Sequence, residues 1–112
     1  MQHVANGVTL ALIAPTGGVK AGVAYMHGEM FVVPTKTADA GANFEAYRTG
    51  NYEGFEAQLA DGVTPDFEGE AAYWILADNK LTTTKTTDSK NNVKVGYFAN
   101  LHGFDALHLI GA

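Results

Sequence analysis

Short apolar runs separated by glycines constrain the fold of this chain more than any other feature. The 112 residues include 13 glycines but only three prolines, and the glycines fall between the apolar runs at regular intervals. Turn residues that recur at intervals of roughly ten residues are typical of small antiparallel β proteins. We therefore expect an all-β fold, a small single-domain antiparallel β-barrel or sandwich of about eight short strands.

The clearest stretch predicts a hairpin. Residues 71–76 are apolar and include the only tryptophan, and residues 81–84 are rich in threonine, whose branched Cβ favours an extended backbone. Asp and Asn within residues 77–80 favour a turn, because their side chains hydrogen-bond to the nearby backbone and they tolerate unusual dihedral angles. The polar residues 86–92 predict a mobile loop tip.

Residues 43–58 are the ambiguous part of the chain. The aromatic residues near its end recur three and four apart, as in a helical turn, whereas the two glycines among them disfavour a long helix. We prefer strands at residues 45–48 and 54–58.

The remaining apolar runs predict strands on both sides of these segments. Pro15 and two following glycines predict a turn after the first run, and Gly96 predicts a β-bulge within a later one. Residues 61–70 and 100–104 are expected to be loops. The full set of expected strands is 8–14, 23–26, 30–33, 45–48, 54–58, 71–76, 81–84, 93–99 and 105–110.

The composition argues against several classes of partner. The net charge is −5 and the seven basic residues are scattered, whereas nucleic acids and anionic membranes are bound by clustered Lys and Arg. No apolar run approaches the ~20 residues that span a bilayer. Because the chain has no cysteine, disulfides and thiolate metal sites are excluded. We expect neither nucleic acid nor membrane as a partner.

The length predicts one domain, because a chain of this size buries enough surface for a single compact core. We assign residues 8–112 to one β domain and residues 1–7, which are small and polar, to a flexible N-terminal arm. The arm lacks the basic start and the apolar core of a signal peptide. Its alternative role is to become ordered on a partner.

The histidines do not form a recognisable catalytic or metal-binding motif. They are His3, His27, His102 and His108, and none has the His-x-x-x-His spacing of a metal site with an adjacent Glu. His102 and His108 bracket Asp105, and a His–Asp pair can orient a general base. On one extended strand, however, residues 102 and 108 would lie ~20 Å apart. We interpret all four as surface or interface residues.

The acidic residues and the single serine are equally uninformative about catalysis. The acidic group comprises Asp61, Asp66, Glu68 and Glu70, and it lacks the spacing and the terminal Glu of a calcium loop. Ser89 is not part of a Gly-x-Ser-x-Gly elbow. We therefore expect no enzyme activity, no cofactor and no metal.

The aromatic residues leave two interpretations open. Most are expected in the core, but Tyr25 and Phe31 are candidate interface anchors, because aromatic residues are enriched at the centres of interfaces. Trp74 and the tyrosines also motivate an alternative function, a small-ligand or carbohydrate-binding β-barrel. An exposed Trp74 would favour that alternative, and a buried Trp74 would weaken it.

Two blocks of the sequence resemble the small phage capsid cement proteins, also called head decoration proteins. The first is Leu-Ile-Ala-Pro-Thr-Gly-Gly-Val-Lys-Ala-Gly at residues 12–22, followed by the apolar run 30–33. The second is Phe-Glu-Gly-Glu-Ala-Ala-Tyr-Trp at residues 67–74, followed by the threonine stretch 81–84 and by Val95-Gly96. The resemblance covers nearly the whole chain and consists of turn glycines and core residues, so it specifies a fold more than a site.

The resemblance implies an accessory protein that binds the major capsid protein on the outer surface of a phage head and stabilises it. It also implies a homotrimer, with a dimer as the second possibility, synthesised in the host cytoplasm. It supplies no binding residues, and our own hypothesis is that the N-terminal arm and the run 30–33 make contacts. The candidate capsid or protomer contacts are Gln2, His3, Val4, Tyr25, Met30 and Phe31.

Overall fold

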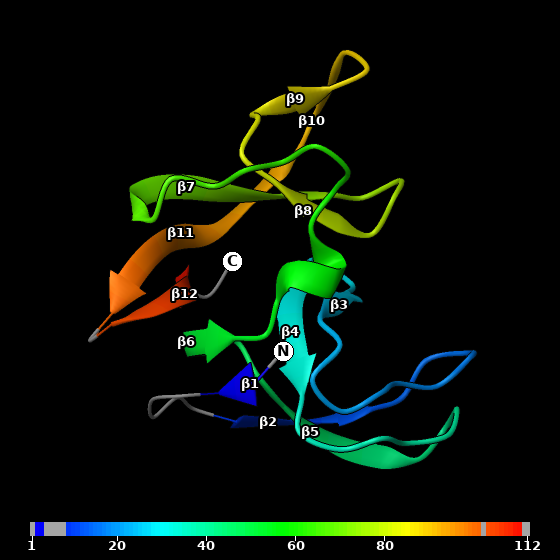
Figure 1. Ribbon diagram of the computed structural model, residues 1–112. Helices are drawn as coiled ribbons and strands as arrows, with labels where there is room; N and C mark the ends of the chain where they lie inside the picture. Colours follow the sequence, from blue (N-terminus) through cyan, green and yellow to red (C-terminus); the bar gives the residue numbers. More distant parts are fainter. Residues whose placement is uncertain (1, 4–8, 102, 111–112) are drawn as a thin grey trace.

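The computed structural model describes residues 2–3, 9–101 and 103–110 (Figure 1). Within these residues every regular element is a strand except for one short 3-10 helix, η1 (Glu56–Gln58). No helix in this part of the chain is long and apolar enough to cross a membrane. The strands are β1 (Gln2–His3), β2 (Thr9–Ile13), β3 (Tyr25–His27), β4 (Met30–Pro34), β5 (Asn43–Tyr47), β6 (Thr49–Glu53), β7 (Glu68–Ile75), β8 (Lys80–Thr82), β9 (Thr86–Thr87), β10 (Lys90–Asn91), β11 (Val93–Leu101) and β12 (Phe104–Ile110).

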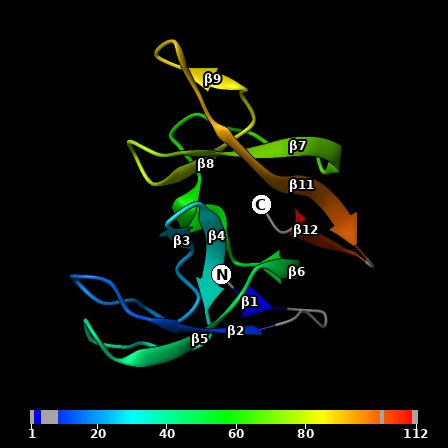
Figure 2. The same cartoon turned by 180° about the vertical axis from the view of Figure 1, so that it is seen from behind.

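The strands form two larger sheets and a separate hairpin. The six-stranded sheet has the order β1-β6-β12-β11-β7-β8, and the four-stranded sheet has the order β2-β5-β4-β3. All neighbouring strands are antiparallel. The β9–β10 hairpin projects from the end of the molecule opposite β2 and β5, as Figures 1 and 2 show. The predicted all-β antiparallel class is confirmed, but among the described residues no sheet closes into a barrel, and short strands are more numerous than predicted.

The main core lies between the two sheets. Phe31 of β4 packs against Trp74 of β7 with 4.9 Å between ring centroids, and both side chains are buried. Burying these large apolar groups is the dominant favourable term in folding. The other buried members are Ala24, Val33, Tyr52, Phe55, Ala72, Leu81, Val95, Phe98, Leu107 and Leu109.

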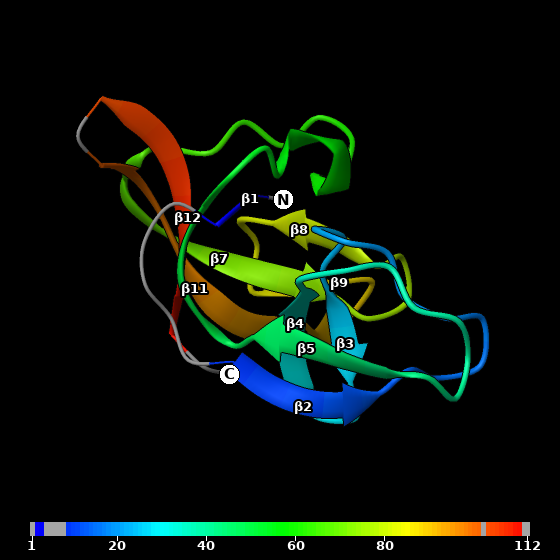
Figure 3. The same cartoon turned by 90° about the horizontal axis from the view of Figure 1, so that it is seen from below.

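Strand β4 is buried on both of its faces. Successive strand residues point to opposite sides, so Phe31 and Val33 enter the main core. Val32 enters a second cluster, which comprises Ala14, Val19, Val32, Phe44 and Ala46. Two loops cover this second cluster, one between β2 and β3 and the other between β4 and β5. They are joined to each other, because Val19 and Ala38 exchange backbone hydrogen bonds of 2.8 and 3.0 Å. Figure 3 shows these loops extending together beyond β2 and β5. Burial on both faces explains why this strand is an unbroken apolar run.

The predicted strand at residues 54–58 is wrong. The strand is β6, which ends before Gly54, and Gly54 has φ +73°, a left-handed conformation that glycine adopts without a steric penalty. The chain then forms η1, closed by a hydrogen bond from Gln58 N to Phe55 O of 2.9 Å. Phe55 is buried in the main core. The helical spacing of the aromatic residues was therefore the more informative signal.

The loop predicted at residues 86–92 is also wrong. These residues form the β9–β10 hairpin, with Thr87 opposite Lys90. The two residues between them, Asp88 and Ser89, both have positive φ, as a two-residue type I′ turn requires. Asn92 fixes the base of the hairpin, because its Nδ2 donates to Thr84 O at 3.0 Å and to Thr87 Oγ1 at 2.9 Å. Strands β7 and β11 also extend into the predicted loops 61–70 and 100–104.

The bulge predicted at Gly96 is confirmed. Lys94 pairs with Tyr73 and Gly96 pairs with Ala72, so Val95 is the extra residue of β11. The bulge resets the alternation of side chains, and Lys94 and Tyr97 share a face although they are three residues apart. Lys94 Nζ donates to Tyr97 Oη at 2.8 Å and lies 4.6 Å from the centre of that ring.

Candidate contact surface

The candidate catalytic residues do not form a catalytic arrangement in the described part of the chain. No group of three or more His, Asp or Glu residues there could hold a metal ion. His108 Nδ1 donates to Asn51 Oδ1 at 2.6 Å, and Asp105 Oδ1 accepts from Asn100 Nδ2 at 3.0 Å. His108 and Asp105 are three apart on β12 and so lie on opposite faces of the sheet. His102 lies outside the described residues.

The acidic group serves the turn before β7. The backbone N of Asp66 donates to Glu70 Oε1 at 2.8 Å, and the backbone N of Glu68 donates to Asp66 Oδ1 at 3.1 Å. Carboxylates that accept bonds from nearby backbone groups stabilise turns. Two of the four candidate carboxylates, Asp66 and Glu70, thus have a structural role. Glu68 takes part through its backbone N, and Asp61 is an exposed residue of another turn.

Trp74 is fully buried. Its ring packs against Phe31 inside the main core, so it offers no platform on which a sugar ring could stack. This observation weakens the alternative of a carbohydrate-binding module.

The predicted contact residues lie on both sheets. Gln2 and His3 form β1, which pairs with Glu53 and Tyr52 at the edge of the six-stranded sheet. Val4 lies outside the described residues. Strand β1 is therefore attached to its own chain, and whether residues 1–7 act as an arm stays a prediction.

The other three predicted contacts belong to the four-stranded sheet. Tyr25 and Met30 are half-buried and pack on the second cluster. Tyr25 Oη shares a hydrogen bond of 2.6 Å with His27 Nδ1, and partial burial raises the pKa of Tyr25. Phe31 is only 1% exposed, so its side chain supports β4 from within the core.

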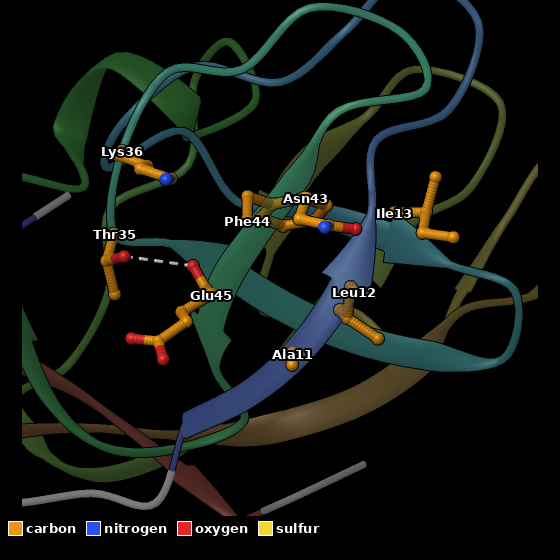
Figure 4. Close-up of a pocket in the computed structure, with 8 residues that line it drawn as sticks. All are labelled: Ala11, Leu12, Ile13, Thr35, Lys36, Asn43, Phe44 and Glu45. Carbon is orange, nitrogen blue, oxygen red and sulfur yellow. Dashed lines mark hydrogen bonds between the residues drawn. The ribbon is translucent and has the colours of Figure 1, made fainter.

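A groove that sequence reasoning did not identify runs along β2 and β5 (Figure 4). It has a volume of about 600 Å³. Ile13 stands at one end with 61% of its surface exposed, more than any other large apolar residue in the described chain. Two charged side chains, Lys36 and Glu45, lie further along it. The other lining residues are Ala11, Leu12, Thr35, Asn43 and Phe44.

The outer edge of β2 presents backbone groups rather than side chains. On the inner side, Ala14 N donates to Ala42 O and Gly41 N donates to Ala14 O, both at 2.9 Å. Antiparallel pairs alternate between hydrogen-bonded and non-hydrogen-bonded positions. Counting back from Ala14 in steps of two, the backbone N–H and C=O groups of residues 12 and 10 therefore point toward β5. Those of Thr9, Ala11 and Ile13 point away from it.

The partner strand supports this assignment. Ala11 lies opposite Glu45, and Glu45 O accepts bonds from Thr35 N at 2.8 Å and from Thr35 Oγ1 at 3.0 Å. The carbonyl of Glu45 thus points away from β2, as it must if Ala11 and Glu45 form a non-hydrogen-bonded pair. We call the outward N–H and C=O groups of Thr9, Ala11 and Ile13 the β2 edge. Its only signal in the sequence is an extended run, Thr-Leu-Ala-Leu-Ile, without a charge.

Comparison with protein families gives a match over most of the chain. Residues 4–102 match the family described as phage cement protein. No curated protein sequence and no solved structure matches the chain significantly.

Proposed function

The chain belongs to the phage cement protein family, and from this premise we propose that it binds the outer surface of a phage head and stabilises the lattice of the major capsid protein. The family match supports a capsid-associated, structural role. It is also the single observation that carries the proposal, because it covers almost the whole β domain.

The physical basis of the proposed stabilisation is mass action. A protein that binds the assembled shell, but not its separated subunits, lowers the free energy of the shell at each occupied site. The effect is multiplied over the many equivalent sites of the lattice. A clamp of this kind must itself resist deformation, and the shared core between the two sheets, with Phe31 against Trp74, supports that requirement.

We propose that the capsid contacts are Gln2, His3 and Val4 together with Tyr25 and Met30. A polar N-terminal segment can add a strand to the exposed edge of a neighbouring sheet. Its present pairing with β6 involves only two residues, so exchanging that pairing for a longer one on the capsid has a small cost. Phe31 contributes by fixing the position of Met30.

The proposed protein acts as a homo-oligomer, a trimer or a dimer, and needs neither nucleic acid nor a membrane. It is made in the host cytoplasm and acts on the virion. The proposal includes no catalytic step.

The test is to mix purified protein with empty, expanded heads of the phage that encodes it. We expect the protein to sediment with the heads up to a fixed ratio and to raise their melting temperature. The control is the same heads with an unrelated acidic β protein. Failure to sediment with the heads at micromolar concentration would contradict the proposal.

The role of the N-terminal segment is tested separately by deleting residues 1–7. We expect lower occupancy of the heads, because the added strand is lost. Urea unfolding of the shortened chain shows whether the β domain is intact. The control variant is Lys90→Ala, which changes the β9–β10 hairpin and leaves residues 1–7 in place. Undiminished occupancy of an intact shortened chain would rule out the segment as a contact.

A further inference from the structure

The β2 edge is the strongest feature that the proposed capsid binding leaves unexplained. Natural proteins usually block a sheet edge with a charged residue, a proline, a bulge or a covering segment. β2 contains no charge, no proline and no register shift, and among the described residues it pairs only with β5. Its large apolar side chain Ile13 has 61% of its surface exposed.

We infer that the β2 edge binds the β2 edge of a second copy of this chain, antiparallel and about a two-fold axis through Ala11. In this register Ala11 faces Ala11 of the partner subunit, and Thr9 faces Ile13 of the partner subunit. The two four-stranded sheets then become one continuous sheet. This inference goes beyond the proposed capsid binding and does not depend on it.

The backbone is complementary to itself in this register. Every outward-facing residue of one copy meets an outward-facing residue of the other, so each N–H of the β2 edge finds a C=O. A shift by one residue would place outward-facing groups opposite residues that already bond to β5. A shift by two residues would leave one end of each edge without a partner. The centred register therefore satisfies the most backbone groups.

The side chains suit the same register. Ala11 is small, so the two chains can approach closely at the axis. Ile13 and Thr9 are both β-branched, and such residues pack well as cross-strand neighbours. On the other face Leu10 meets Leu12 of the partner subunit, and both are half-buried at present.

Charge does not oppose the pairing, although each copy has a net charge of −5. Within β2 and β5 the one acidic residue is Glu45, directly opposite Ala11. In the paired state the two Glu45 side chains are three strand spacings apart, ~14 Å. That separation exceeds the Debye length of about 8 Å at physiological salt.

The size of the contact sets its strength. Two five-residue strands cover less than the ~1,200 Å² of a stable interface, so the free protein associates weakly and in a concentration-dependent way. Copies held side by side on a surface have a much higher effective concentration. Of the two oligomers that we consider, this pairing favours the dimer, because a two-fold contact closes after two copies.

Disulfide trapping tests the register. The chain has no cysteine, so Ala11→Cys introduces the only thiol. A directly opposed, hydrogen-bonded pair has its Cα atoms ~5.5 Å apart, within the range that a disulfide spans. The matched control is Thr9→Cys on the same strand, because the two Thr9 positions lie four residues apart along the pair, ~13 Å.

Under mild oxidation of the free protein we expect Ala11→Cys to form a covalent dimer at least about tenfold faster than Thr9→Cys, because pairing raises the local thiol concentration. Equal rates, or no dimer from either variant, would overturn the inference. A second variant, Ala11→Lys, places two cations at the axis, and we expect it to abolish concentration-dependent association in sedimentation velocity.

The two proposals fail separately, because trapping is measured without heads. If Ala11→Lys instead abolished binding to heads while Ala11→Cys formed no dimer, the β2 edge would be a site for a capsid strand, and the inference would be overturned. If Ala11→Cys formed dimers that did not bind heads, the pairing would stand and the capsid-binding proposal would fail.

Discussion

The edges of the two sheets differ in whether another segment of the chain covers them. In the six-stranded sheet, Leu59 forms a parallel bridge with Leu81 of β8, and Ala60 N donates to Leu81 O at 2.8 Å. In the four-stranded sheet, Gln58 covers the chain next to β3, because its side-chain amide donates to Ala24 O at 2.9 Å and accepts from Ala24 N at 3.0 Å. One segment, η1 and the two residues after it, therefore covers β8 at an edge of the six-stranded sheet and the residue before β3 in the four-stranded sheet.

The β2 edge has no such cover in the described part of the chain. It lies at the far side of the four-stranded sheet from η1, as the sheet order β2-β5-β4-β3 requires. In this fold an edge is covered where another segment of the chain passes beside it, and no described segment passes beside the outer side of β2. It also sets the closely packed region around β11, where Gly96 has no room for a Cβ, against the uncovered edge at β2.

Gly96→Ala gives the largest expected effect, because it changes the closely packed region around β11. A Cβ on Gly96 would collide with the carbonyl oxygen of His108 on the neighbouring strand, so β11 and β12 would have to separate. We expect a loss of more than about 4 kcal/mol in the free energy of unfolding, or failure to fold. Urea unfolding measures it.

Gly62→Ala is the control for Gly96→Ala. Gly62 has open space around it and φ +76°. An alanine there should therefore lower the free energy of unfolding only through its left-handed backbone conformation, by about 1–2 kcal/mol. Similar losses from the two variants would show that the contact between β11 and β12 is not tight.

Phe31→Ala tests the link between the sheets. Phe31 is fully buried against Trp74, and removing a buried phenylalanine costs about 3–5 kcal/mol through lost contacts and the cavity left behind. The neighbouring Met30→Ala is the control, because Met30 is half-buried and has less contact to lose. If the two variants lose the same stability in thermal unfolding, β4 is not the element that joins the sheets.

The sequence alone was sufficient for the class of fold and for most strands. The hairpin around Asp78 and Asn79 and the bulge at Gly96 could be predicted because their causes are local: turn side chains that bond to their own backbone, and a glycine where two strands approach closely. The segment after Gly54 was recognised only as an alternative, because the helical spacing of its aromatic residues does not reveal that Phe55 turns inward. Its position is set by packing against Phe67 and Phe98, with ring centroids 6.0 and 5.6 Å away.

The contact surface was harder to predict than the fold. Phe31 was predicted to be an interface anchor because the sequence shows that it is aromatic but does not show that it is buried. The β2 edge is a property of strand order, and strand order depends on partners far away in the sequence. The run Thr9–Ile13 predicts a strand, but only the sheet topology reveals that this strand lies at an edge.

Gln58→Ala removes the side chain that covers the backbone of Ala24 next to β3. Ala24 is buried, so its N–H and C=O would lose their partners in a place with little access to water. We expect a loss of about 2 kcal/mol and increased self-association, measured by urea unfolding and light scattering. Gln58→Glu, which can accept from Ala24 N but cannot donate to Ala24 O, should have an intermediate effect on association. Unchanged scattering would show that side-chain cover is unimportant at this edge.

Tyr52→Phe gives the smallest effect at neutral pH and compares a tyrosine of the six-stranded sheet with Tyr25 of the four-stranded sheet. Tyr52 is fully buried on β6 and its Oη donates to Thr49 O at 2.7 Å, so the variant loses about 1 kcal/mol at pH 7. Burial, with a smaller contribution from Tyr47, raises the pKa of Tyr52 well above its ordinary value. Burial also raises the pKa of the less buried Tyr25.

The direction of the pH dependence follows from the raised pKa of each tyrosine. A raised pKa means that the folded chain keeps the phenol proton at a pH where the unfolded chain has lost it. The stabilisation is complete below about pH 10, the pKa of an unperturbed tyrosine, and decreases as the pH rises toward the folded pKa. Urea unfolding between pH 9 and pH 11 should show stability falling steeply in the unmodified chain and less steeply in Tyr52→Phe. Tyr25→Phe should change that slope less, and an equal change from both variants would contradict the contrast between the two sheets.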